Sequence, residues 1–204
     1  MAAPITHVVL AAKIFNTFFQ GKVKKDFFIG TLFPDIRYLK VIDRDKTHYN
    51  NLTLDDLKED DSFLAGVKFH SILDVAREKF MVDHDVYSLC PESKYVFQSL
   101  KLLEDQLFYS YIENWNEYID YLHKILPSAL DFGVAKNDIE KWQSLLQQYF
   151  QAPPSEQVVI NFALAVGFTN DIAYEINKNI ITMSTNKKIV NIIKKLYKNF
   201  DSLI

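Results

Sequence analysis

An imidazole and a carboxylate stand in the middle of an apolar helical stripe in residues 63–81. At helical spacing this stripe carries Phe63, Val67, His70, Asp74, Arg77 and Met81. Residues four apart stack on one helix face, so the His70 imidazole and the Asp74 carboxylate are neighbours. A buried carboxylate without a partner costs several kcal/mol. The stripe therefore requires another side chain, a water network or a metal ion beside Asp74.

Three more polar residues stand in comparable settings. His7 shares a helix face with Ala11, Ile14 and Phe18, Asp35 directly follows a proline in LFPDIR, and His48 follows an irregular connection in KTHYN. Imidazole nitrogens and carboxylate oxygens suit zinc or another borderline divalent metal. Each residue alone also fits a hydrogen-bonded core or turn role. From the residues alone, His7, Asp35, His48, His70 and Asp74 are candidate ligands for such an ion, and a network of hydrogen-bonded core side chains is the alternative.

Helical periodicity dominates the segments that must position these residues. A helix over 6–20 and another over 24–33 are expected, the second ended by Pro34. An irregular connection over 35–52 and a turn capped at Thr53 precede the long helix, for which Ser62 is the expected N-cap. Further helices are expected over 92–125, 137–150, 155–180 and 186–202. The sequence predicts a single all-α domain over 1–204, a bundle of about seven helices.

Composition excludes several other classes of protein. Of the 204 residues 49% are hydrophobic, so a disordered chain is excluded, and only 5 Gly and 6 Pro argue against a strand-rich fold. The net charge of −3 gives no overall basic field, so a nucleic-acid partner is not expected. The first residues lack the positive charge of a signal peptide and Cys90 is the single cysteine, so we expect a cytoplasmic protein.

The sequences of four short segments, and their order along the chain, resemble the zinc-dependent phospholipase C family. This family is related to the single-strand-specific zinc nucleases. The four segments are THVVLAAKIF, FFIGTLFPDI, THY and FLAGVKFHSILD, and they cover roughly residues 4 to 80. Similar proteins carry a Thr-His that opens a helix, a Gly-x-x-x-Pro-Asp stretch, a lone His, and a Gly-x-x-x-His-x-x-x-Asp helix. The resemblance implies an all-α phospholipase C-like fold and metal-dependent hydrolysis of a phosphoester, with phospholipid as one candidate substrate.

The resemblance also implies a role for each candidate ligand. Asp35, His48, His70 and Asp74 would bind one metal ion directly, and His7 would join Asp74 at a neighbouring ion, with Asp74 bridging the two. Metals so placed would stabilise the charge of a phosphate group and activate a water molecule. Asp35 would in addition act as the catalytic base for that water.

The chain departs from the family's pattern downstream of the long helix. The fullest members hold a further metal with two histidines and a glutamate, whereas this sequence has Arg77, Gln98 and Leu102 in the corresponding region. We therefore expect one or two zinc ions. The departure also favours an alternative, a non-catalytic binding protein that keeps the fold with a reduced metal site.

Two further hypotheses arise from other segments. An HD-type phosphohydrolase would use His48, the His84–Asp85 doublet and Asp171. Residues 187–204 form a basic amphipathic pattern, which is typical either of a helix lying on an anionic membrane or of a helix that closes the bundle. Closure of the bundle is the expectation, because the last helix of a soluble domain must bury one face.

Overall fold

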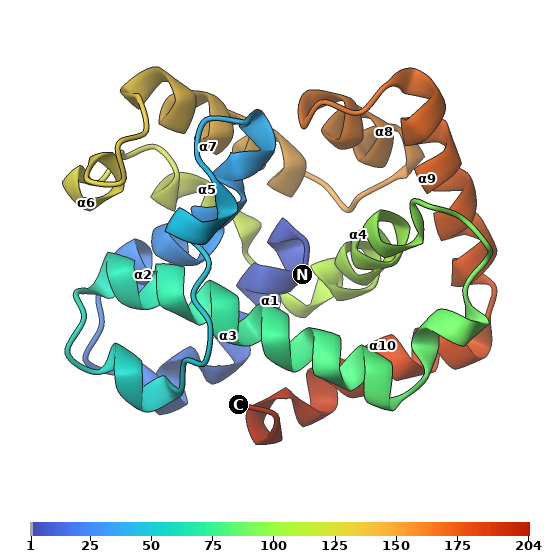
Figure 1. Ribbon diagram of the computed structural model, residues 1–204, viewed down its shortest axis with the longest axis horizontal. Helices are drawn as coiled ribbons and strands as arrows, with labels where there is room; N and C mark the ends of the chain where they lie inside the picture. Colours follow the sequence, from blue (N-terminus) through green and yellow to red (C-terminus); the bar gives the residue numbers. More distant parts are fainter. Residues whose placement is uncertain (1) are drawn as a thin grey trace.

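Ten α-helices form the protein, and the computed structural model describes residues 2–204 (Figure 1). In chain order they are α1 (Pro4–Phe18), α2 (Lys24–Leu32), α3 (Ser62–Asp83), α4 (Val96–Phe108), α5 (Trp115–Tyr121), α6 (Pro127–Leu130), α7 (Lys136–Phe150), α8 (Glu156–Ala165), α9 (Asn170–Ser184) and α10 (Lys187–Asn199). Short 3₁₀ helices lie between them, including η1 (Pro34–Leu39), and no strand occurs within residues 2–204. The all-α prediction is confirmed.

Several predicted boundaries are wrong. The segment 92–125 contains two helices, α4 and α5, separated by a 3₁₀ turn, and the segment 155–180 contains α8 and the start of α9. Gly167 causes the second break, because its φ of 95° lies in the left-handed region that ends helices. The N-cap of α3 is Asp61, whose side chain accepts from the Leu64 N–H at 2.8 Å, and not Ser62. The expected count of about seven helices is thus too low.

Two glycines set the contact between α2 and α3. A Cβ added at Gly30 would lie 2.1 Å from the Phe63 carbonyl oxygen, and one added at Gly66 would lie 2.1 Å from the Phe27 carbonyl oxygen. The backbones of the two helices therefore touch, which only glycine permits. This contact brings the end of α2 and η1 beside the middle of α3.

A buried carboxylate on α4 holds the start of α1. The α1 N-cap, Ala3, has no side chain that accepts a hydrogen bond, so the first N–H groups of the helix need another acceptor. Asp105 accepts from the backbone N–H of Thr6 at 2.7 Å and of Ile5 at 3.2 Å, and from the Tyr149 hydroxyl at 3.0 Å. This interaction fixes the first turn of α1, which carries His7.

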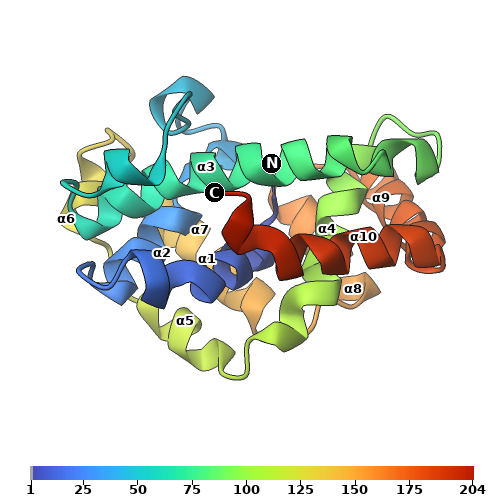
Figure 2. The ribbon, with the colours of Figure 1, turned by 90° about the horizontal axis from the view of Figure 1, so that it is seen from below.

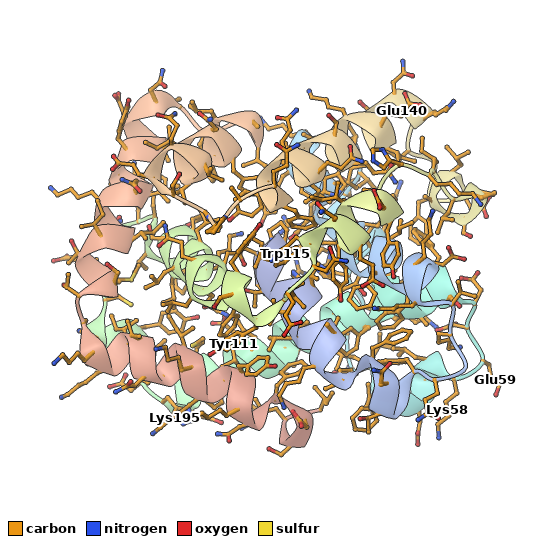
Figure 3. The ribbon with its side chains drawn as sticks, turned by 180° about the vertical axis from the view of Figure 1, so that it is seen from behind. Lys58, Glu59, Tyr111, Trp115, Glu140 and Lys195 are labelled. Carbon is orange, nitrogen blue, oxygen red and sulfur yellow. The ribbon has the colours of Figure 1, made fainter. Side chains whose placement is uncertain are left out.

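The apolar face of α10 packs into the molecule. Ile189, Ile193, Leu196 and Phe200 are fully buried, while Leu203 is exposed. In Figure 2 α10 runs beside α3, and in Figure 3 Lys195 projects from its outer side. Closure of the bundle accounts for the apolar residues, so any contact with a membrane would depend on the exposed lysines. Among the helices of residues 2–204, none has the length and apolar character that crossing a membrane requires.

Candidate metal centre

The structure brings the five predicted ligands together from four separate segments. His7 lies on α1, Asp35 on η1, His48 in the connection before α3, and His70 and Asp74 on adjacent turns of α3. Each of the five residues is at most 6% exposed. The α3 stripe from Phe63 to Met81 is buried throughout, as its spacing predicts.

Each histidine has one ring nitrogen fixed by a hydrogen bond. His7 Nδ1 donates to the Ala3 carbonyl oxygen at 3.2 Å, and His70 Nδ1 donates to the Thr31 carbonyl oxygen at 2.9 Å. A carbonyl oxygen only accepts, so the proton of each ring is on Nδ1. His48 Nδ1 lies 3.0 Å from the Thr47 hydroxyl, which itself donates to the Arg44 carbonyl oxygen and is left to accept.

The other nitrogen of each ring carries a lone pair and points into the site. His7 Nε2, His48 Nε2 and His70 Nε2 are buried and have no hydrogen-bond partner within residues 2–204. Buried polar atoms are normally satisfied, and three orphaned acceptors in one place require an explanation. Metal-ligating histidines hold one nitrogen by a hydrogen bond in this way and present the other to the ion.

Asp74 lies among the three orphaned nitrogens. Its Oδ1 is 3.4 Å from His7 Nε2, and its Oδ2 is 3.6 Å from His70 Nε2 and 3.9 Å from His48 Nε2. Its Oδ1 also accepts from the Ala2 N–H at 2.6 Å, which fixes the carboxylate. Ligands bound to one tetrahedral zinc at 2.0–2.1 Å lie roughly 3.4 Å apart. The spacing around Asp74 is close to that value.

The charges of the site favour ligation at neutral pH. Burial lowers the pKa of His70 to about 3 and the pKa of His48 to about 4, so both rings are neutral. The His7 and His70 rings stack at 3.9 Å, an arrangement that two imidazolium cations would oppose. Burial acts to raise the pKa of Asp74, but the neighbouring His70 and His7 outweigh it and the pKa is lowered well below its ordinary range.

Asp35 completes the site from the side of η1. Among residues 2–204 its buried Oδ1 has no hydrogen-bond partner, and it lies 3.5 Å from Nη2 of Arg37. Burial acts to raise the pKa of Asp35, whereas His70 and Lys101 lower it further, so the carboxylate is ionised at neutral pH.

These atoms form two overlapping groups that fit a divalent metal. One group is His7, His70 and Asp74, the other is Asp35, His48 and His70, and within each the ligand atoms lie within 4.8 Å of one another. Asp74 contacts all three histidines, but the residue common to both groups is His70. The bridging role of Asp74 stays a prediction. A donor set of neutral imidazoles and carboxylates suits zinc or another borderline divalent metal.

The α3 residue one turn beyond Asp74 belongs to a separate network. Arg77 is fully buried and forms a bidentate ion pair with Glu104 of α4. Its Nη1 also donates to the Tyr87 hydroxyl at 3.0 Å. A guanidinium repels a metal ion, so the additional metal of the fullest phospholipase C-like proteins finds no ligand at Arg77. Sequence reasoning missed Glu104, although its place on the apolar face of α4 between Leu100 and Phe108 is the same signal that marks Asp74.

The residues of the HD-type hypothesis do not meet. His84 and Asp85 are exposed at the end of α3, and Asp171 is exposed on α9. Within residues 2–204 neither ligand group contains them, and His48 belongs to the group with Asp35 and His70.

Known proteins offer no further guide to the site. No known protein family, curated protein or solved structure matches this chain. The resemblance to the zinc-dependent phospholipase C family therefore rests on the motifs within residues 4–80.

The lowered pKa of His48 predicts a pH-dependent loss of stability in metal-free protein. The unfolded state takes up a proton at the ordinary pKa of about 6.5, whereas folded His48 takes it up only near pH 4. Stability is therefore lost as the pH falls from about 6.5 towards 4, with a slope of up to about 1.4 kcal/mol per pH unit for one group.

Urea denaturation of chelator-treated wild type and His48→Gln across this range measures the effect. The wild type should lose stability relative to the variant as the pH falls. Taking the difference removes the contribution of Asp105, whose pKa burial raises to about 7 and which acts in the opposite direction. A constant difference between pH 7 and pH 4.5 would contradict the prediction.

Proposed function

We propose that this protein is a metal-dependent phosphoester hydrolase of the zinc-dependent phospholipase C-like class, with a related fold. The observation that carries the proposal is the convergence of three orphaned histidine nitrogens on the Asp74 carboxylate. The order of the motifs along residues 4–80 supports the same class. A bound divalent ion would supply Lewis-acid stabilisation of the phosphate charge and would make a water molecule easier to deprotonate.

The residues of the site have distinct roles in this proposal. His7, His48, His70 and Asp74 would hold and orient the metal, one or two zinc ions in all. Asp35 would bind metal as well and would accept the proton of the attacking water, a role that suits a carboxylate kept ionised by its neighbours. Fixed Nδ1 hydrogen bonds keep the rings in the ligating orientation, so the site needs little reorganisation when the metal binds.

Two adjoining pockets beside the site favour a substrate that has an apolar group. One, of about 260 Å³, is lined by His48 and Asp74 together with Ser71 and Val75. The other, of about 530 Å³, shares Ser71 and Val75 and continues over mainly apolar residues: Leu52, Leu54, Ile72, Ala76, Leu203 and Ile204. A phosphoester bound at the metal centre would have room for an attached hydrocarbon group in these two pockets, as in a phospholipid.

Metal analysis and hydrolysis assays test the proposal together. Purified protein loaded with zinc should retain it through gel filtration and should hydrolyse bis(p-nitrophenyl) phosphate or a short-chain phosphatidylcholine. Chelator-treated protein should be inactive until zinc is restored. A wild type that takes up no metal would overturn the proposal, and retained zinc without hydrolysis would favour the non-catalytic binding protein.

The Asp35→Asn variant tests the role of the base. Asparagine keeps the size of the side chain and an oxygen ligand but cannot accept the proton. At saturating zinc we expect the rate to fall about 10²–10⁴-fold, the usual contribution of a general base. Wild-type activity in zinc-saturated Asp35→Asn would show that Asp35 is not the base.

A further inference from the structure

We infer that Arg37, Tyr38 and Lys101 form an anion-binding subsite at the edge of the metal centre, which holds the phosphate group of the substrate. This inference rests on the proposed function and adds the residues that recognise the substrate's charged group. Arg37 and Tyr38 lie on η1, two and three residues after Asp35, and Lys101 reaches Tyr38 from α4.

Lys101 is a half-buried cation with no carboxylate partner. Its Nζ donates to the Tyr38 hydroxyl at 2.7 Å and lies 4.8 Å from the centre of the Tyr38 ring. Within residues 2–204 it forms no ion pair, and the Tyr38 hydroxyl is its only hydrogen-bond partner. A lysine ammonium has three N–H donors, so two of them are directed at solvent or at a ligand.

The Tyr38 hydroxyl lies between two cations. Arg37 Nη2 donates to it at 3.1 Å, and the Arg37 guanidinium stacks on the same ring at 4.4 Å. Because the oxygen accepts from both Arg37 and Lys101, its own O–H remains a donor for a third group. Lys101 offers two N–H donors and Tyr38 one O–H donor, and Arg37 adds a second positive charge beside them. This is the chemistry that binds a phosphate oxygen.

The subsite is electrostatically part of the metal centre. Arg37 Nη2 is 3.5 Å from the Asp35 carboxylate. Burial acts to lower the pKa of Lys101, but Tyr38, Asp35 and Asp74 outweigh it and raise the pKa. The charges of Arg37 and Lys101 cancel those of Asp35 and Asp74, so a bound divalent ion leaves the site with a net positive charge. A phosphate ester supplies the compensating negative charge.

Calorimetric titration of inorganic phosphate into zinc-loaded protein, freed of excess metal, tests the subsite. Lys101→Met removes the charge and keeps the length of the side chain. We expect it to weaken phosphate binding about 10-fold or more, with zinc content unchanged. Lys101→Arg should restore most of the affinity, and Lys195→Met, an exposed lysine on α10, should leave it unchanged. Tyr38→Phe, which keeps the ring, should weaken binding several-fold.

The outcomes separate this inference from the proposed function. Wild-type affinity for phosphate in folded Lys101→Met overturns the subsite, as does a wild type that binds no phosphate. Loss of zinc from Lys101→Met also overturns it, because that result would make Lys101 a support of the metal site. If wild type holds no zinc but binds phosphate, and Lys101→Met weakens that binding, the subsite stands and the proposed function fails.

Discussion

Alanine in place of His70 is expected to abolish metal binding at the whole site. His70 belongs to both ligand groups, so its loss leaves neither with three ligands. Removing even an outer partner of a metal ligand usually lowers metal affinity 10–100-fold, so loss of the ligand itself should lower it by about 100-fold or more. Any phosphoesterase activity should disappear with the metal.

His84→Ala provides a matched control for this variant. His84 lies at the end of the same helix, and its Nδ1 also bonds a backbone carbonyl, that of Phe80, at 2.9 Å. Its side chain is exposed and takes no part in either ligand group. Zinc content after dialysis, measured by elemental analysis, should be wild-type in His84→Ala and near zero in His70→Ala. Equal zinc retention by the two variants would contradict the prediction.

The α3 stripe shows how far the sequence determines the candidate site. A polar pair in an apolar stripe requires a partner wherever the helix packs, so His70 and Asp74 are informative before any fold is known. His7 and Asp35 carry the same signal, since each stands among apolar residues. Their convergence from separate segments depends on how α1, α2 and α3 pack, which helical periodicity does not reveal. The expectation that they share one site came from the order of the motifs.

The residues that sequence reasoning missed reach the site or the core through tertiary contacts. Lys101 is an ordinary helical lysine in KLLED, and nothing in its spacing reveals that α4 passes beside η1. Tyr38 and Arg37 lie in a segment expected to be irregular, where side-chain directions cannot be derived from a period. Asp105, which caps α1 from 99 residues away along the chain, is equally invisible to local patterns.

The sequence prediction missed two breaks between helices, for different reasons. Gly167 and the following Thr169 form a visible stop and start signal between α8 and α9, so that break was predictable. The break between α4 and α5 has no Gly or Pro. There Trp115 donates to the Tyr109 carbonyl at 2.9 Å, and the two rings stack at 4.8 Å, so side-chain packing ends the helix against its local propensity.

Alanine in place of Gly66 is expected to damage both the fold and the site. The new Cβ would lie 2.1 Å from the Phe27 carbonyl oxygen and 2.8 Å from the Thr31 backbone nitrogen, so two helix backbones must separate. Overpacking a core commonly costs 1–3 kcal/mol, and a clash between backbones should reach about 3 kcal/mol or more. For a chain of this size that corresponds to a fall in Tm of roughly 6–12 °C.

The same separation should weaken metal binding, because α2 supports the site across this contact. The Thr31 carbonyl fixes His70 Nδ1 at 2.9 Å, and Asp35 follows α2 directly. Gly21→Ala is the control, since a Cβ there meets nothing within 4 Å and should change stability by no more than about 0.5 kcal/mol. Thermal unfolding with and without zinc measures both effects. The zinc-induced rise in Tm should be lost or much reduced in Gly66→Ala and kept in Gly21→Ala. A Gly66→Ala protein with wild-type Tm and zinc response would show that the α2–α3 contact does not position the metal ligands.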